Sequence, residues 1–287
     1  MKLTEVKTLT RTIRKHESVH VFVSFITILI FSIFTTPLYA NTTSDRERTD
    51  RQCWHENKQQ VLVFGDSNTW GWKPVAEGFP ARRYAKYERW TSILESTLNN
   101  QHPASVIADG LISRTINLDA GQAVGELTKE AFNGSRDIVN SMAKHAPLDW
   151  IVIMLGTNDL APSYERSPKE IAEAAFALAE KARQQDNILY SAYRAPQVLL
   201  IVPPPIGSTV NTPLHGIFDG AQTPSKQIAA AFLKEADKHT DIHLLDAGQI
   251  ITTDGIDGVH FSRQNHITLG KAVARFLLRK DSSCNQA

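Results

Sequence analysis

The sequence is poor in cysteine and has almost no net charge, and both shortages exclude classes of protein. Only two of the 287 residues are cysteine, Cys53 and Cys284, and neither belongs to a Cys-x-x-Cys pair. A zinc ribbon, an iron–sulfur site or a disulfide-rich scaffold would need more ligands or bridges. Lysine and arginine total 31 against 30 aspartates and glutamates. Because no positive excess draws the chain to phosphates, we expect no nucleic-acid partner.

The first 40 residues have the pattern of an export signal. Basic residues precede an uncharged apolar run at 21–34, and Ala40 ends a stretch that a signal peptidase could cleave. The run is shorter than the roughly 20 residues of a spanning helix, which favours a cleaved signal. The alternative is an uncleaved membrane anchor, because no charged residue occurs between Ser18 and Ser44. We expect a signal peptide at 1–40, an N-terminal extension at 41–60 and one domain at 61–287, in a periplasmic or secreted protein.

Export would also give the two cysteines a meaning, because disulfides persist in oxidising compartments. Cys53 precedes the first expected strand and Cys284 follows the last expected helix. They could form a disulfide, but two unpaired thiols fit equally well, since the sequence does not give the distance between their Cα atoms.

Apolar runs alternate with helix-period stretches along the rest of the chain. Such nearly continuous hydrophobic runs are typical of parallel strands buried on both faces. The runs lie at 61–64, 105–108, 150–155, 198–202 and 242–245. Ser167, Pro168 and Glu170 have the pattern of a helix start, and the final helix should run from about 264 to 278. The sequence predicts a three-layer α/β/α fold with a flavodoxin-like, doubly wound sheet of about five parallel strands.

Polar residues follow the expected strands where such sheets place their functional sites. Ser67 comes directly after the first strand, Gly110 ends the second, Asn158 follows the third, and Asp257 precedes His260 after the fifth. Serine needs a base to become a nucleophile, and the base needs a partner that fixes its tautomer. We therefore assign Ser67 as nucleophile, His260 as base and Asp257 as its orienting carboxylate. The Ser67 and Gly110 amides and the Asn158 side chain would form an oxyanion hole.

These segments resemble the four blocks of the SGNH (GDSL-type) hydrolases, in the family's order. The match is closest to the arylesterase and acyltransferase branch, which includes a mycobacterial acyltransferase. The matching segments are Gly-Asp-Ser-x-Thr-Trp-Gly-Trp at 65–72, Gly-Leu-x-x-Arg-Thr at 110–115, Pro-Leu-Asp through Gly-Thr-Asn-Asp at 147–159, Pro-Pro-Pro at 203–205 and Asp-Ala-Gly through His-Phe at 246–261. The resemblance implies the same triad and oxyanion residues. An acyl-serine mechanism needs no cofactor and no metal.

One departure from that branch lies beside the nucleophile. Asn68 stands where the acyltransferase has an apolar residue. Packing or hydrogen bonding behind Ser67 should therefore differ, and acyl selectivity with it.

Three functions fit the sequence. The first is a serine esterase for short-chain, acetyl-type esters, with possible acyl transfer to alcohols. The second is an exported O-acetylesterase acting on carbohydrate or cell-envelope polymers. The third is a non-catalytic, flavodoxin-like module whose loop at 67–69 binds a phosphate, which would leave Asp257 and His260 without a role. A small-molecule or glycan ester is the expected partner, a membrane only if the leader stays attached, and a homo-oligomer is compatible with the sequence.

The pocket is the least determined part of the site. Its shape should depend on the segments 73–89, 117–136, 186–197 and 206–222. Candidate lining residues are Trp70, Trp72, Tyr190, Tyr193, Ile217 and Phe218. Asp66 and Asp159 are interpreted as carboxylates that hold the loops. Arg114 could bind an anionic substrate, although a surface salt bridge is its more ordinary role.

Overall fold

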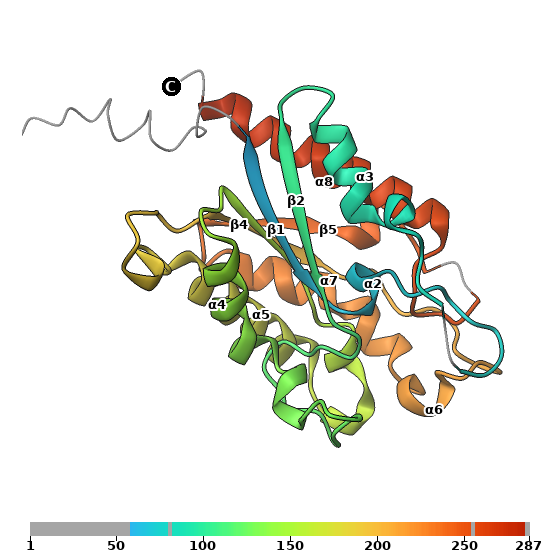
Figure 1. Ribbon diagram of the computed structural model, residues 1–287. Helices are drawn as coiled ribbons and strands as arrows, with labels where there is room; N and C mark the ends of the chain where they lie inside the picture. The colour runs from blue at the N-terminus through green and yellow to red at the C-terminus, as the bar shows by residue number, and fades with distance from the viewer. Residues whose placement is uncertain (1–57, 80–81, 254–255, 285–287) are drawn as a thin grey trace, which may run out of the picture. The chain divides into compact units, whose positions relative to one another are not determined.

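Five parallel strands form the sheet of this protein. The computed structural model describes residues 58–79, 82–253 and 256–284 (Figure 1). The strands are β1 (Gln59–Gly65), β2 (Ala104–Gly110), β3 (Trp150–Met154), β4 (Gln197–Val202) and β5 (Ile242–Asp246). Their order is β2-β1-β3-β4-β5, with every pair parallel. This is the flavodoxin-like order, so the predicted fold class is confirmed.

Helices cover both faces of the sheet. Those described are α2 (Ser67–Trp70), α3 (Trp90–Leu98), α4 (Gly134–His145), α5 (Pro168–Arg183), α6 (His215–Phe218), α7 (Gln222–Ala236) and α8 (Arg263–Cys284). The described part of the chain also contains six short 3-10 helices: η1 (Lys86–Glu88), η2 (Lys129–Phe132), η3 (Asn158–Leu160), η4 (Pro162–Tyr164), η5 (Ile188–Tyr190) and η6 (Ala247–Gln249). None of the helices within the described ranges is both long and apolar enough to cross a membrane.

Alternating strand residues divide the core into two layers. One cluster contains Val63 and Val152 with side chains of α3 and α8. The other contains Phe64 and Ile153 with side chains of α4, α5 and α7. Because successive strand residues point to opposite faces, each buried strand supplies both clusters. In Figure 1, α3 and α8 lie together on one side of the sheet, and α4, α5 and α7 on the other.

A local sequence signal explains where α5 begins. The Ser167 hydroxyl accepts the Glu170 N–H, and the Glu170 carboxylate accepts the Ser167 N–H, as the predicted capping box requires. The last helix begins at Arg263 and reaches Cys284, further than the predicted 278. The expected signal peptide and Cys53 lie outside the described residues, so leader cleavage and the disulfide stay predictions.

The register of the sheet aligns the carboxyl ends of β1, β2 and β3, which the sequence motifs follow. Gly65, the last residue of β1, pairs with Gly110 on β2 and with Met154 on β3. The segments that follow these three strands therefore start from one edge of the sheet, its carboxyl edge.

Candidate active site

Ser67 opens a helix of one turn at the end of β1. Asp66 caps this helix, because its Oδ1 accepts the Asn68 N–H at 2.9 Å. Gly71 ends it in the left-handed conformation at φ 95°, which glycine adopts without strain. The tight turn fixes Ser67 above the sheet edge with 5% of its surface exposed.

Three side chains from distant segments meet there in a hydrogen-bonded series. Ser67 Oγ lies 3.0 Å from His260 Nε2, and His260 Nδ1 lies 2.8 Å from Asp257 Oδ2. The other carboxylate oxygen, Asp257 Oδ1, accepts the backbone N–H groups of Val259 and His260 at 3.0 and 2.9 Å. Asp257 is fully buried, and His260 nearly so. The loop thus holds both the carboxylate and the imidazole facing the serine.

The charge of Asp257 determines the tautomer of His260. Burial alone would raise the pKa of Asp257, but the hydrogen bonds from the His260 ring and from the backbone keep it below its usual value. The carboxylate is therefore ionised near neutral pH and accepts the Nδ1 proton. In the neutral ring this leaves the lone pair of Nε2 facing the Ser67 hydroxyl.

The expected oxyanion residues follow the two neighbouring strands. Asn158 begins η3 after β3, and its Nδ2 donates to the Arg114 carbonyl at 3.0 Å. Since an amide nitrogen carries two hydrogens, this bond orients the group and leaves one hydrogen for a ligand. Gly110 packs against helix α2, because a Cβ there would lie 2.2 Å from the Trp70 nitrogen. Close approach of two backbones thus explains this glycine.

Asp66 and Asp159 are buried beside the series. Burial raises the pKa of each to about 6, against the opposing effect of their hydrogen bonds. Asp159 accepts the Ile116 N–H and pairs with Arg166 at 2.9 Å. Asp159 therefore holds the loop after β2, whereas Asp66 bonds to the backbone of the first turn of α2.

Arg114 has neither of the two roles considered from the sequence. Its side chain is buried, and its guanidinium donates to the carbonyls of Gly65 and Asp109 and to the carboxylates of Asp109 and Asp137, all between 2.8 and 3.0 Å. It is neither a surface salt bridge nor a free anion-binding group. It joins the carboxyl ends of β1 and β2.

The two tryptophans after the nucleophile lie near the imidazole. The Trp72 ring stacks on His260, with centroids 5.0 Å apart and an interplanar angle of 18°. Trp70 is 6.3 Å from Trp72, and the Arg83 guanidinium lies over its ring. The partly exposed ring of Phe79 contacts Trp72 edge-on. These rings form an aromatic surface beside His260.

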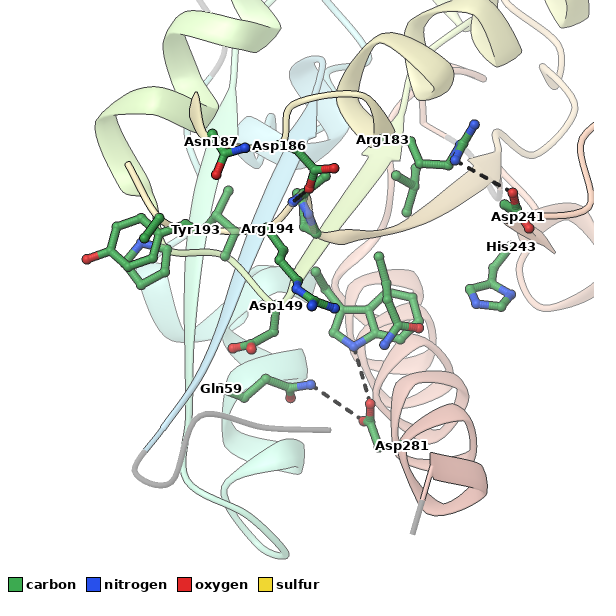
Figure 2. A pocket seen from close by; sticks show the side chains of 18 of the residues that line it. Gln59, Asp149, Arg183, Asp186, Asn187, Tyr193, Arg194, Asp241, His243 and Asp281 are labelled. Atoms are coloured by element: carbon green, nitrogen blue, oxygen red, sulfur yellow. Dashed lines mark hydrogen bonds and ion pairs between the residues drawn. The ribbon is translucent and has the colours of Figure 1, made fainter. Parts of the chain in front are cut away.

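Other candidate pocket residues do not lie there. Tyr193 lines a separate pocket of about 1080 Å³ with Gln59, Asp149 and Gln197, at the amino ends of the strands (Figure 2). Tyr190 is fully exposed on the same loop. This loop follows a helix and leads into β4, so it lies at the amino edge, opposite Ser67. The predicted roles of Tyr190 and Tyr193, and of the segment 186–197, in shaping the mouth were therefore wrong.

Helix α6 carries the remaining two candidates. Phe218 is 3% exposed and belongs to the hydrophobic core, so it does not line the mouth. Ile217 is exposed beside it. The segment containing both follows β4, at the same sheet edge as Ser67.

Two residues, Val75 and Asn68, support the series through three hydrogen bonds that the sequence did not predict. The Val75 N–H donates to Asp257 Oδ2 at 3.3 Å, and the Asn68 side chain bonds to the backbone on both sides of His260. The only sequence signal was the polar residue at 68 where the related branch has an apolar one.

A hydroxyl, an imidazole and a carboxylate in this order, at the carboxyl edge of a doubly wound sheet, have the geometry of a serine hydrolase. Residues 61–273 match the family model described as GDSL-like Lipase/Acylhydrolase. The chain belongs to this family, and the identification from its motifs is confirmed. Membership also confirms the predicted class of carboxylic ester hydrolase and leaves the non-catalytic module without support.

Solved structures agree with this assignment. The native Mycobacterium smegmatis aryl esterase is 35% identical, with a TM-score of 0.71 over 77% of this chain and 99% of that one. Est24, a carbohydrate acetylesterase from Sinorhizobium meliloti, is 36% identical with the same TM-score and coverage. A putative arylesterase from Agrobacterium tumefaciens is 28% identical, with a TM-score of 0.66 over 77% of this chain and 99% of that one. A comparison with curated proteins gave no match.

Proposed function

We propose that this protein hydrolyses short-chain carboxylic esters through an acyl-Ser67 intermediate. The observation that carries the proposal is the hydrogen-bonded series from Ser67 through His260 to Asp257. Its distances are those of an activated nucleophile, its base and the group that orients the base.

In the first step Ser67 Oγ attacks the ester carbonyl and gives its proton to His260 Nε2. Negative charge then develops on the carbonyl oxygen, where the N–H groups of Ser67 and Gly110 and the Asn158 amide would donate. The tetrahedral intermediate collapses, the bond to the alcohol breaks, and the alcohol takes the proton from His260. Water repeats the sequence on the acyl-enzyme and releases the acid.

The aromatic surface beside His260 supports small acyl groups and aryl leaving groups. Trp72 occupies space next to the base, and Phe79 extends the apolar wall outward. Likeness to the M. smegmatis aryl esterase agrees with this choice. Where an alcohol replaces water at the acyl-enzyme, the same steps give acyl transfer.

Acetylated carbohydrate is the second candidate substrate. Likeness to the S. meliloti carbohydrate acetylesterase favours it at similar identity. It also agrees with the export that we propose from the leader, since such polymers lie outside the cytoplasm. The N-terminal sequence of the protein recovered from its native host would test export and cleavage after Ala40.

Two assays test the function and separate the candidates. p-Nitrophenyl acetate, butyrate and octanoate report acyl length, and acetate release from acetylated xylan reports the carbohydrate alternative. We expect Ser67→Ala to abolish turnover and Asn158→Ala to lower kcat about 10²- to 10³-fold. Ser96→Ala removes an exposed hydroxyl that bonds only to its own helix, and it should leave turnover unchanged. Turnover that survives in Ser67→Ala would contradict the proposal.

A further inference from the structure

Asn68, the residue after the nucleophile, bonds to the chain on both sides of the base. Its side chain is 2% exposed. Oδ1 accepts the Phe261 N–H at 3.1 Å, and Nδ2 donates to the Val259 carbonyl at 3.4 Å. Val259 and Phe261 are the two neighbours of His260, so one amide holds the backbone before and after the imidazole.

The partners leave no ambiguity in how the amide is oriented. The Phe261 N–H can only donate, and the Val259 carbonyl can only accept. The oxygen of Asn68 must therefore face Phe261, and its nitrogen must face Val259. The side chain imitates the paired N–H and C=O of a neighbouring strand.

The two bonds of Asn68 connect the helix that carries Ser67 to the loop that carries Asp257 and His260. Asp257 accepts the Val259 and His260 N–H groups, but it belongs to the same loop as His260. Among the hydrogen bonds within the described ranges, only three join helix α2 to residues 257–261: the Ser67–His260 contact and the two bonds of Asn68. The Trp72 ring adds stacking on His260 but no directional bond.

We propose that Asn68 is a positioning residue that sets the distance between Ser67 Oγ and His260 Nε2. The role rests on the proposed function, since it has meaning only if these two atoms exchange a proton. Ser67 and Asn68 are consecutive in a capped turn, so fixing the amide of one against the histidine loop fixes the hydroxyl of the other. A displacement of about 1 Å at a reacting centre can lower a rate about 10²-fold.

The variants Asn68→Leu and Asn68→Asp test this role in the full-length protein. Leucine has similar size but removes both bonds. Aspartate keeps the shape and the acceptor for Phe261, but when ionised it places a carboxylate oxygen against the Val259 carbonyl. Thr69→Val is the matched control, because Thr69 lies on the same turn, is fully buried and has a hydroxyl with no hydrogen-bond partner.

We expect Asn68→Leu to lower kcat on p-nitrophenyl acetate about 10- to 100-fold, with KM changed less than about threefold. The rate at which diisopropyl fluorophosphate labels Ser67 should fall in parallel, because labelling needs the same serine and base but no particular ester. Asn68→Asp should lose activity in the same direction, and Thr69→Val should stay within about twofold of the wild type.

Each result has a distinct meaning. If Asn68→Leu and Asn68→Asp melt at lower temperature but keep the kcat and labelling rate of Thr69→Val, Asn68 only stabilises the fold and the inference is overturned. If Asn68→Leu does not fold, Asn68→Asp decides by the same criterion. An unreactive Ser67 in the wild type would instead contradict the proposed function, and the positioning role with it.

Discussion

Replacing Asp257 by asparagine should disable the base while leaving the loop in place. Asp257 Oδ1 accepts two backbone N–H groups, so the oxygen of the new amide must occupy that position. Its NH₂ group would then lie where Oδ2 was, 2.8 Å from His260 Nδ1. An NH₂ group only donates, so Nδ1 must accept and the ring proton must move to Nε2. The imidazole would then present an N–H to Ser67 and could not remove its proton.

The size of the loss follows from the tautomer. The same exchange in a serine protease triad lowers kcat about 10⁴-fold, and each tenfold step is about 1.36 kcal/mol, so about 5.5 kcal/mol of transition-state stabilisation is at stake. The cost in stability should be smaller, because both backbone bonds to Oδ1 survive and only the long bond from the Val75 N–H to Oδ2 is lost.

Kinetics on p-nitrophenyl acetate and thermal melting of the same samples would test this. Asp246→Asn is the control, since Asp246 Oδ1 accepts the Gly248 N–H at 2.8 Å in a similar turn but takes no part in the series. It should retain kcat within about twofold. A loss of less than about tenfold in folded Asp257→Asn would refute the reasoning.

Three further changes test the surroundings of the site. Gly110→Ala places a Cβ 2.2 Å from the Trp70 nitrogen, so the free energy of unfolding, measured in urea, should fall by about 3 kcal/mol. Arg114→Met leaves two carbonyls and two partly exposed carboxylates without their donor and should cost about 2–3 kcal/mol by the same measurement. Burial raises the pKa of Asp281 to about 6, so the folded state holds this proton more tightly and loses stability as pH rises from about 4 to about 6. Asp281→Asn should therefore be more stable than the wild type by about 1–2 kcal/mol at pH 8, where water in the adjoining pocket screens the charge, and equal to it at pH 4. A gain at pH 4 as large as at pH 8 would contradict this origin.

Most of the fold and the triad could be read from local pattern. Apolar runs marked all five strands, most clearly the central strands β1, β3 and β4, because these are buried on both faces. Ser67, Asn158 and His260 were placed together because parallel strands present their carboxyl ends at one edge, so residues far apart in sequence converge there. The capping box at Ser167 needs only neighbours three residues away, and the sequence therefore predicted that helix start correctly.

What depends on distant neighbours was decided only by the tertiary structure. Helix α2 has four residues, too few for a periodic pattern to reveal it. Arg114 is buried because the ends of β1 and β2 lie side by side in the sheet. Tyr190 is exposed on a loop at the amino edge of the sheet. The hydrogen bond from the Phe261 N–H to Asn68 Oδ1 joins residues that are 193 positions apart in the sequence. Propensity and spacing act within a few residues, whereas a hydrogen bond between a helix and a remote loop exists only once packing has brought both together. The sequence alone thus determined the fold class and the chemistry of the reacting groups, and the packing of remote segments determined how those groups are held.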